Sequence, residues 1–272
     1  MSDEYSHRLN RLLASLPTDS FERLHPHLQL VSMSLGEVLL RQHVRFEHVY
    51  FPTTAAVSLV SILKNGASAE IGLIGNEGML GTSLMMGGED SAWQAVVQSA
   101  GEGYRLKFAR LKEEFERTPP VLALLLRYMQ ALTIQTGQTA VCNRHHSVDQ
   151  QLCRWLLLTL DRVMTNKVHM TQDLIAQMLG VRREGVTAAA GKLQEAGLIR
   201  YSRGTITVLD RPGVAERSCE CYETVKHEID RLVPMPVRPM SEDVRATSDL
   251  AAVAAIIARS VLQIPDPEPG IP

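Results

Sequence analysis

In residues 28–108, apolar residues fall in short runs that are separated by glycine-containing turns. Runs of this length with glycine at their ends are typical of β-strands. Strands this short and this regularly spaced predict a small closed or double-layered β unit. Residues 5–25 look helical, and we expect them to form a cap on this unit. The predicted strands are LQLVSMSL, EVLLRQ, HVYFP, AAVSLVSIL, AEIGLIG, SAWQAVVQSA and YRLKFA.

Apolar residues repeat at helical spacing after Pro119 and Pro120, and these two prolines suit the first turn of a helix. A stripe of mostly apolar residues then recurs at alternating spacings of four and three, and it can lie on the β unit or against the same helix of a second chain. Two features favour a second chain: another apolar set is available to cover the β unit, and the stripe turns polar and small towards its C-terminal half. The stripe is Val121, Leu125, Tyr128, Leu132, Gln135, Thr139 and Cys142, and the other set is Leu122, Leu126, Met129 and Ile134.

Residues 170–198, MTQDLIAQMLGVRREGVTAAAGKLQEAGL, predict two short helices that meet at Gly180. Thr171 can cap the first helix with its hydroxyl, and Gly180 can adopt the positive φ that a tight turn needs. The solvent face of the second helix combines long polar side chains at its start with small ones after them, as a reader of the DNA major groove requires. An ordinary helical hairpin in an unrelated core is the alternative. The residues of this face are Arg182, Arg183, Glu184, Thr187, Ala188 and Gly191.

Two strand-like runs follow, residues 198–202 and 205–209, on either side of Arg203 and Gly204. Two helices and then a hairpin predict a winged helix, in which Arg203 can reach a DNA phosphate. Residues 148–163 form another amphipathic pattern and predict the first helix of this domain. After a break, residues 214–232 return to a helical pattern, and an isolated helix is predicted at 248–262.

The chain of 272 residues is long enough for two domains with separate cores. Its net charge of −2 excludes a uniformly basic surface, so any contact with nucleic acid must come from a local patch. The first residues lack the apolar region of a signal peptide, and the most apolar runs are too short to span a bilayer. We therefore expect a cytoplasmic protein without membrane contact. Four irregularly spaced cysteines argue against a disulfide framework.

The segment LGVRREGVT, the wing and the ending Cys-Glu-Cys-Tyr at residues 219–222 make the chain similar to the cyclic-AMP receptor protein/Fnr (Crp/Fnr) family of bacterial transcription regulators. The resemblance covers about residues 8–223. It implies an α+β fold: a jelly-roll-like β-roll with a helical cap in residues 1–118, a dimerisation helix in 119–146 and a winged helix-turn-helix in 147–223. Residues 224–272 are expected to form a partly mobile helical and proline-rich tail.

The resemblance also implies a homodimer that binds a palindromic operator in double-stranded DNA. Arg183 and Glu184 match the arginine and glutamate with which relatives read a GTGA half-site, but Ala188 stands where relatives place a second arginine. The expected DNA-binding residues are Thr171, Gln172, Arg182, Arg183, Glu184, Thr187, Ala188 and Arg203. The expected dimer interface residues are Leu125, Tyr128, Leu132, Gln135 and Thr139.

Relatives that bind cyclic AMP hold its phosphate with an arginine followed by a small hydroxyl residue, and its ribose with a glutamate. In this chain Asp90 stands at the arginine position, before Ser91, and Thr82 stands at the glutamate position. An anionic side chain repels a phosphodiester, so we expect an effector other than cyclic AMP, or none. RNA polymerase and an unknown small-molecule effector stay open as partners.

No cofactor and no metal site are predicted. Oxygen-sensing relatives hold an iron–sulfur centre with N-terminal cysteines, whereas no cysteine precedes Cys142 here. Cys219 and Cys221 with His227 are candidate zinc or redox ligands, but one Cys-X-Cys pair lacks a full ligand set. Among the other histidines, His48 is interpreted as structural, and His25, His27, His145 and His146 as surface residues.

Two functions are compared on this basis. The first is a sequence-specific DNA-binding transcription regulator, and the second is a ligand-binding regulatory protein whose winged helix contacts other proteins. An enzyme is not expected, because the chain has no nucleophile–base set, P-loop or dinucleotide fingerprint. The basic set Arg182, Arg183, Arg200 and Arg203 favours DNA, since Glu184 is the one acid expected on the same face.

Overall fold

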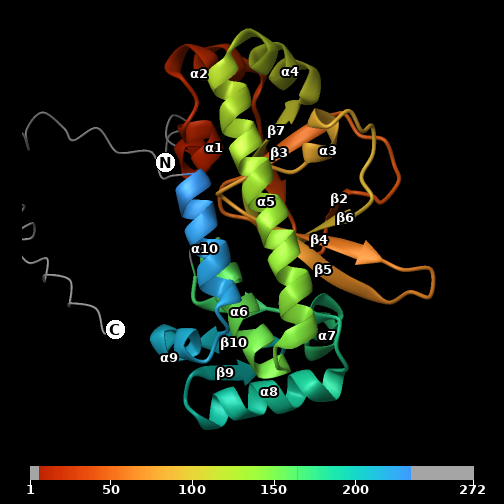
Figure 1. Cartoon of the computed structure of the whole chain (residues 1–272), viewed down its shortest axis with the longest axis vertical. Helices are drawn as coiled ribbons and strands as arrows, with labels where there is room; N and C mark the ends of the chain where they lie inside the picture. The colour runs from red at the N-terminus through yellow and green to blue at the C-terminus, as the bar shows by residue number, and fades with distance from the viewer. Residues whose placement is uncertain (1–5, 164, 234–272) are drawn as a thin grey trace, which may run out of the picture. The chain divides into compact units, whose positions relative to one another are not determined.

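The structure is a computed structural model that describes residues 6–163 and 165–233 (Figure 1). A helical cap comes first and consists of η1 (Ser6–Leu9), α1 (Arg11–Ala14), α2 (Thr18–Leu24) and η2 (His25–His27). Asn10 joins this cap to the strands. Its side-chain oxygen accepts hydrogen bonds from the backbone of α1, and its amide nitrogen donates to the carbonyls of Pro52 (2.9 Å) and Gly78 (2.8 Å). Since Asn10 is fully buried, its side chain needs these partners.

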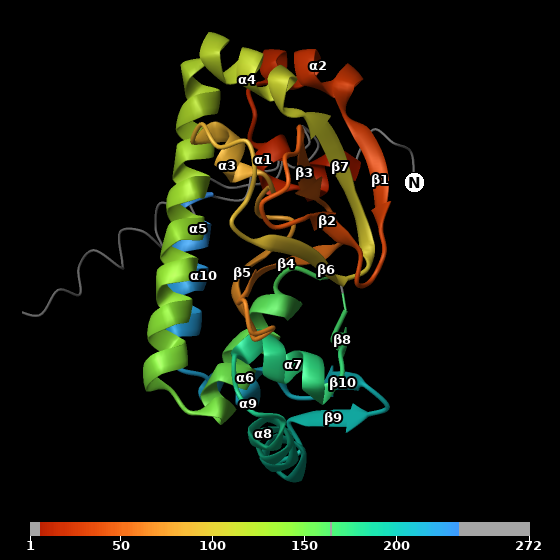
Figure 2. The ribbon, with the colours of Figure 1, turned by 90° about the vertical axis from the view of Figure 1, so that its right-hand side faces the viewer.

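Two antiparallel sheets form the β-roll beside α5, as Figure 2 shows. One sheet has the order β1-β7-β3 and the other β2-β6-β4-β5. Buried aliphatic side chains, among them Met33, Val57 and Ile74, form the core between the sheets. The predicted double-layered β unit is therefore confirmed. Its strands are β1 (Gln29–Met33), β2 (Val38–Leu40), β3 (His48–Pro52), β4 (Ala56–Ile62), β5 (Ser68–Ile74), β6 (Gln94–Ser99) and β7 (Gly101–Lys107).

Two helices of this region were not predicted from the sequence. The short α3 (Thr82–Met85) lies between β5 and β6, and α4 (Phe108–Arg117) follows β7 directly. In α4, Glu114 accepts hydrogen bonds from the guanidinium of Arg23 in α2 at 2.9 and 2.7 Å, and these bonds lower the pKa of Glu114 to about 2. The ion pair therefore ties α4 to the N-terminal cap.

The predicted long helix is confirmed as α5 (Pro119–His145), but the predicted orientation of its two apolar stripes is wrong. Leu125 is 1% exposed, and Tyr128 donates a hydrogen bond to the carbonyl of Met79 at 2.8 Å. Gln135 donates to the carbonyl of Leu73 in β5 at 3.0 Å. These three residues, assigned above to a dimer interface, are buried inside their own chain and offer no area to a second one.

The other two residues of that assignment also contact the chain itself. Leu132 packs against the core of the roll, and Thr139 accepts a hydrogen bond from Arg154 at 2.7 Å. The set that was expected to cover the roll is the more exposed one, with Leu126 52% exposed. The two stripes lie side by side on one helix and each contains several large apolar residues, so their spacing alone does not decide which of them meets the sheet.

The winged helix-turn-helix is confirmed. It contains α6 (Val148–Leu160), β8 (Lys167–His169), α7 (Gln172–Leu179), α8 (Arg183–Glu195), β9 (Ile199–Ser202) and β10 (Thr205–Val208). Ser147 and Gln150 form a capping box at the start of α6, which explains the clean break after α5. The strand β8, which was not predicted, completes a sheet of order β8-β10-β9.

The last described helices are α9 (Arg211–Glu216) and α10 (Cys221–Leu232). The single helix predicted for residues 214–232 is thus interrupted, and α10 packs along α5. The helix predicted at residues 248–262 and most of the tail lie outside the described residues. None of the helices in residues 6–163 and 165–233 has the length and apolar character that crossing a membrane requires.

Candidate nucleic-acid interface

The two helices of the helix-turn-helix are fixed by local caps and a shared core. The Thr171 hydroxyl accepts a hydrogen bond from the backbone N–H of Leu174 at 3.3 Å, as predicted for an N-cap. Gly180 ends α7 with φ +66°, the left-handed conformation that the turn requires. Ile175 of α7 and Val186 of α8 are fully buried, so the helices present their outer faces in one fixed orientation.

The outer face of α8 begins with the residues expected to read DNA. Arg182 is the N-cap and Arg183 the first residue of α8, and both are exposed. Glu184, Thr187 and Ala188 continue this exposed face along the first turns of the helix. Long polar side chains therefore project at the N-terminal end of α8, and a small residue allows close approach one turn later.

Asp173 of α7 lies beside Arg183 on this face, and an acid at this place was not predicted from the sequence. It forms an ion pair with Arg183 at 3.4 Å, and both side chains are about 60% exposed. An exposed pair of this kind contributes only about 0–1 kcal/mol, so Arg183 can exchange it for a DNA contact. The Thr187 hydroxyl donates to Gln172 Oε1 at 2.7 Å, which orients the Gln172 amide at the start of α7.

The wing tip lies beside the start of α7. Arg203 and Gly204 both have positive φ, +50° and +73°, the combination of a type I′ hairpin turn. The carbonyl of Gly204 accepts a hydrogen bond from the backbone N–H of Met170 at 2.8 Å, directly before Thr171. Thr171 and Arg203, both predicted to contact phosphates, are thus brought together from positions 32 residues apart in the chain.

Charge on this surface is locally basic although the chain as a whole carries −2. Within the described part of the chain, no ion pair engages Arg182, Arg200 or Arg203, and all three are exposed. With Arg183 they outnumber the neighbouring acids Asp173 and Glu184. A basic patch next to a free helix face has the electrostatics expected of a DNA-binding surface.

Comparison with known proteins agrees with this geometry. Residues 150–217 match the model of the Crp-like helix-turn-helix domain. These residues form a Crp-like helix-turn-helix domain. FixK2 from Bradyrhizobium japonicum superimposes with a TM-score of 0.59 at 15% identity, covering 71% of this chain and 98% of that one. A Crp/Fnr-family transcriptional regulator from Thermus thermophilus has a TM-score of 0.55 at 20% identity, with 72% and 98% covered.

Among curated proteins, the chain is similar to the global nitrogen regulator of Nostoc sp. (strain PCC 7120 / SAG 25.82 / UTEX 2576). The two are 24% identical over 171 residues, which cover 60% of this chain and 77% of the relative. The match agrees with the expectation of a DNA-binding transcription regulator with a helix-turn-helix.

The segment predicted to replace a cyclic-nucleotide phosphate site carries its own ion pair. Glu89 pairs with Arg45, and both side chains are exposed. The backbone of the segment is held to the neighbouring loop, because His43 N–H donates to the Ser91 carbonyl at 2.8 Å. Thr82 is the first residue of α3. Arg45 of this loop region is thus already paired with the carboxylate of Glu89.

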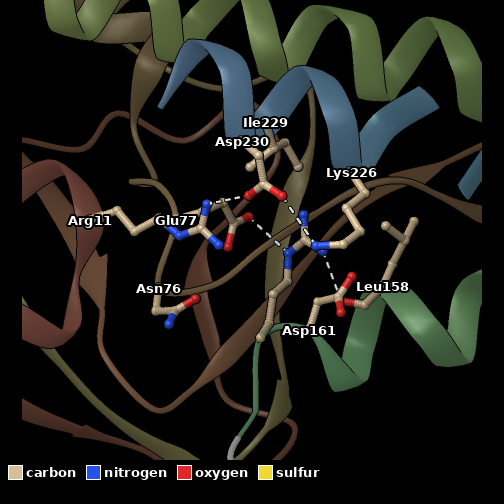
Figure 3. A pocket seen from close by; sticks show the side chains of 9 residues that line it. Arg11, Asn76, Glu77, Leu158, Asp161, Lys226, Ile229 and Asp230 are labelled. Atoms are coloured by element: carbon tan, nitrogen blue, oxygen red, sulfur yellow. Dashed lines mark hydrogen bonds and ion pairs between the residues drawn. The ribbon is translucent and has the colours of Figure 1, made fainter. Parts of the chain in front are cut away.

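A polar pocket of about 120 Å³ lies where the cap, α6 and α10 meet (Figure 3). Its cations are paired: Arg11 with Asp230 at 2.7 Å, Lys226 with the same carboxylate at 3.1 Å, and the lining Arg162 with Glu77 at 2.8 Å. Pockets for small-molecule ligands commonly measure about 300–1,000 Å³. This pocket is too small and too evenly paired to be the site of a nucleotide-sized effector.

The histidine that lies next to Cys219 and Cys221 is not the one that was predicted. His146, expected at the surface, has a side chain only 14% exposed, whereas His227 is exposed. Cys219 and Cys221 are joined by Cys142 of α5 and by His146, the residue directly after α5, and not by His227, so the set of candidate ligands has four members. The spacing of four residues between Cys142 and His146 was the available signal in the sequence.

Proposed function

We propose that the protein binds a palindromic operator as a homodimer and reads each half-site with the N-terminal end of α8. The observation that carries this proposal is the exposed face of α8, where Arg182, Arg183 and Glu184 project beside the basic wing tip while the opposite face is buried. Free arginines on this face favour DNA over a protein partner. Binding to bacterial DNA would take place in the cytoplasm.

The proposed readout uses three neighbouring positions of α8. Arg183 can donate two hydrogen bonds to guanine O6 and N7, and Glu184 can accept from a cytosine amino group. Ala188 offers only a methyl contact, so the base pair that relatives read there with an arginine should be weakly specified. Thr171, Gln172 and Arg203 contact phosphates and set the register.

The readout is tested by binding to a randomised duplex library at two salt concentrations. Arg183→Ala should cost about 1–3 kcal/mol on the preferred site and relax the preference at one base pair. Arg203→Ala should weaken all sequences alike and reduce the salt dependence by about one unit. Arg41→Ala, at an exposed position of the roll, is the matched control and should change neither. An unchanged sequence preference for Arg183→Ala would show that α8 does not read the operator through this face.

For the dimer we propose the outward face of α5. Leu126 is 52% and Val141 49% exposed, and the small Gly137 and Ala140 between them are not buried either. An apolar and small face of this length on an isolated chain is suited to close packing against the same helix of a second copy. The proposal replaces the buried stripe that the spacing had suggested.

Light scattering tests this face. Leu126→Glu combined with Val141→Glu should halve the molar mass, and circular dichroism should remain that of the folded protein because both positions are exposed. Leu63→Glu, at a leucine that is 59% exposed near the end of β4, is the control and should leave the mass unchanged. A dimer that survives the double substitution would exclude this face.

We further propose that the effector is not cyclic AMP, because Asp90 occupies the position of the phosphate-binding arginine. Calorimetric titration with cyclic AMP at micromolar concentrations should give no binding isotherm. A saturable micromolar isotherm would overturn the assignment of the phosphate segment.

A further inference from the structure

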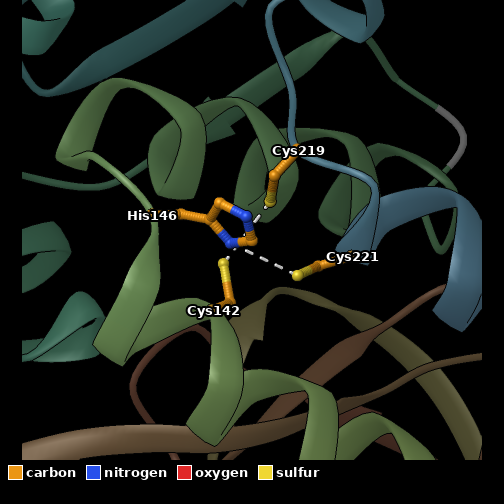
Figure 4. Close-up of side chains that lie close together, drawn as sticks. All are labelled: Cys142, His146, Cys219 and Cys221. Atoms are coloured by element: carbon orange, nitrogen blue, oxygen red, sulfur yellow. Dashed lines mark hydrogen bonds between the residues drawn. The ribbon is translucent and has the colours of Figure 1, made fainter.

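Three cysteines and one histidine from two distant parts of the chain converge beside the C-terminal end of α5 (Figure 4). Cys142 lies in the last turn of α5 and His146 directly follows that helix, while Cys219 lies in the loop after α9 and Cys221 begins α10. The three sulfur atoms and the histidine nitrogen all lie within 4.8 Å of one another. Four atoms that bind transition metals therefore surround one point.

The distances suit a single tetrahedral ion. The sulfur atoms of Cys142 and Cys219 are 3.5 Å apart, and the Cys221 sulfur is 3.4 Å from His146 Nδ1. In a tetrahedral zinc site with Zn–S of about 2.3 Å and Zn–N of about 2.0–2.1 Å, neighbouring sulfurs are about 3.8 Å apart and a sulfur and a nitrogen about 3.6 Å. These two pairs lie within a few tenths of an ångström of the tetrahedral values, and since every other pair lies within 4.8 Å, shifts of at most about 1 Å would close the set around one zinc ion.

The surroundings orient the ligands as they do in zinc proteins. His146 Nε2 lies 3.3 Å from a carboxylate oxygen of Glu220, which favours a proton on Nε2 and leaves the Nδ1 lone pair towards the sulfurs. Gln138 Nε2 lies 3.1 Å from the Cys221 sulfur and can donate a hydrogen bond to it. Partners of this kind around the ligands fix ring orientation and stabilise thiolate.

The grouping of these cysteines, and not their burial, separates the cluster from an ordinary core cysteine. Cys142 and Cys221 are 0% and Cys219 is 4% exposed, and the three contact one another as a group apart from the aliphatic core. The fourth cysteine, Cys153, is equally buried but lies within the main core of α6. Cys153 therefore shows what a structural cysteine of this chain looks like, and the cluster departs from it.

We propose that Cys142, His146, Cys219 and Cys221 bind one zinc ion in a closed Cys3His site. Three S–H bonds break, three protons leave to solvent and three S–Zn bonds form, while neutral His146 binds through Nδ1; no electron is transferred. With four protein ligands the ion has no open position for a substrate, so its role is structural. A two-iron cluster holds its four ligands as two pairs on different iron atoms, and a ligand of one pair lies further from the other pair than the 4.8 Å that bounds this set.

The position of the ion gives it a specific structural effect. It would join the end of α5 to the start of α10, and the capping box of α6, the first helix of the winged domain, begins one residue after His146. The angle at which α5 continues into the DNA-binding domain would then depend on the metal.

The test uses the full chain, purified without chelators. Zinc is measured by elemental analysis and, independently, with a chromogenic chelator that binds the zinc released when the cysteine thiols are modified. We expect about one zinc per chain and, after exchange with cobalt, the visible bands of tetrahedral Co²⁺ with thiolate ligands. Cys219→Ser and His146→Ala should reduce bound zinc at least tenfold, whereas the matched control Cys153→Ala should retain it. Chelation should lower the melting temperature of the wild type and not that of Cys219→Ser.

Three results would overturn the proposal. The first is a wild-type chain that, when titrated with each metal, binds neither zinc nor cobalt in tetrahedral geometry. This titration tests the proposal even where a variant fails to fold, because it uses no variant. The second is stoichiometric iron with acid-labile sulfide. The third is a Cys142–Cys219 disulfide in the unreduced protein found by mass spectrometry, which would assign the pair to redox chemistry.

Discussion

Two buried polar clusters join α5 to the rest of the fold, and they differ in how completely the protein pairs their atoms. Near the middle of α5, Arg162 donates to Glu77 at 2.8 Å, to the Leu158 carbonyl at 2.7 Å and to Gln135 at 3.1 Å. Gln135 in turn donates to the Leu73 carbonyl at 3.0 Å. At the end of α5, the Cys–His cluster instead points four electron-pair donors at one another.

The difference separates a polar group that holds a fold from one that holds a ligand. A buried hydrogen-bond network is stable when each donor meets an acceptor, as in the Arg162 network. Thiols and an imidazole nitrogen that converge can lose the thiol protons and direct their lone pairs at one point, and this is the arrangement that a metal ion completes. Counting hydrogen-bond donors against acceptors therefore distinguishes a structural polar cluster from a ligand site, which burial alone does not.

The largest effect is expected from breaking the complete network. Arg162→Met leaves Glu77 without its cation, and the two side chains are only 3% and 7% exposed. Removing one member of a buried pair typically costs about 3–5 kcal/mol, because the remaining charge stays buried. Urea denaturation of the variant should show a loss of this size in the free energy of unfolding.

Two further variants sharpen this result. Arg110→Ala removes an exposed pair with Glu113 and should cost no more than about 0.5 kcal/mol. Glu77→Leu combined with Arg162→Met should cost less than Arg162→Met alone, since no buried charge is left unpaired. If Arg162→Met were as mild as Arg110→Ala, the network would not be a stabilising element.

An intermediate effect on the free energy of unfolding is expected from Glu70. This buried carboxyl has a hydrogen-bond partner, as the Arg162 network does, but among the described residues no cation is paired with it. It accepts a hydrogen bond from the Ser58 hydroxyl at 2.6 Å, and no ion pair reaches it within residues 6–163 and 165–233. Burial raises the pKa of Glu70 to about 7 from 4.5. Between these values the folded state binds more protons than the unfolded state, so the free energy of unfolding should fall by about 1–3 kcal/mol as pH rises from 4.5 to 7.

Denaturation at a series of pH values checks this slope. Glu70→Gln should flatten the curve in this window and make the protein more stable than the wild type above it, whereas Glu102→Gln, at an exposed carboxyl of β7, should leave the slope unchanged. A slope that persists in Glu70→Gln would have to come from other groups.

The smallest of these effects concerns a single neutral hydrogen bond. Tyr128→Phe removes the bond to the Met79 carbonyl and keeps the ring that covers Gly78. We expect a loss of about 1 kcal/mol in the free energy of unfolding, the usual value for one buried hydrogen bond. The measurement is again urea denaturation; a loss as large as that of Arg162→Met would mean that Tyr128 is part of a larger coupled network.

Local patterns predicted much of the fold. The strands of the roll, the Thr171 cap, the turn at Gly180 and the hairpin at Arg203 and Gly204 follow from preferences that act within a few residues. The basic face of α8 was visible for the same reason, since helical periodicity places its residues on one side. The strand β8 was missed because three residues carry too little pattern.

Tertiary arrangement was harder to predict. Leu125 and Leu126 are neighbours of the same type, yet the first is buried against the roll and the second is exposed, because only the docked sheet distinguishes them. Cys142 and Cys219 meet across 77 residues, and nothing near either of them in the sequence indicates the other. Asp173 lies in the first turn of α7, and its ion pair with Arg183 depends on how the two helices cross, which the sequence alone does not give.

The packing of α10 along α5 also determines the order in which the protein can finish folding. About 75 residues separate the end of α5 from the start of α10, so at synthesis rates of about 5–20 residues per second the ribosome delivers α10 roughly 4–15 s after α5. Until then the side of α5 that receives Val225, Ile229 and Leu232 is uncovered. A nascent chain would therefore leave part of α5 open to chaperones or to a neighbouring nascent chain.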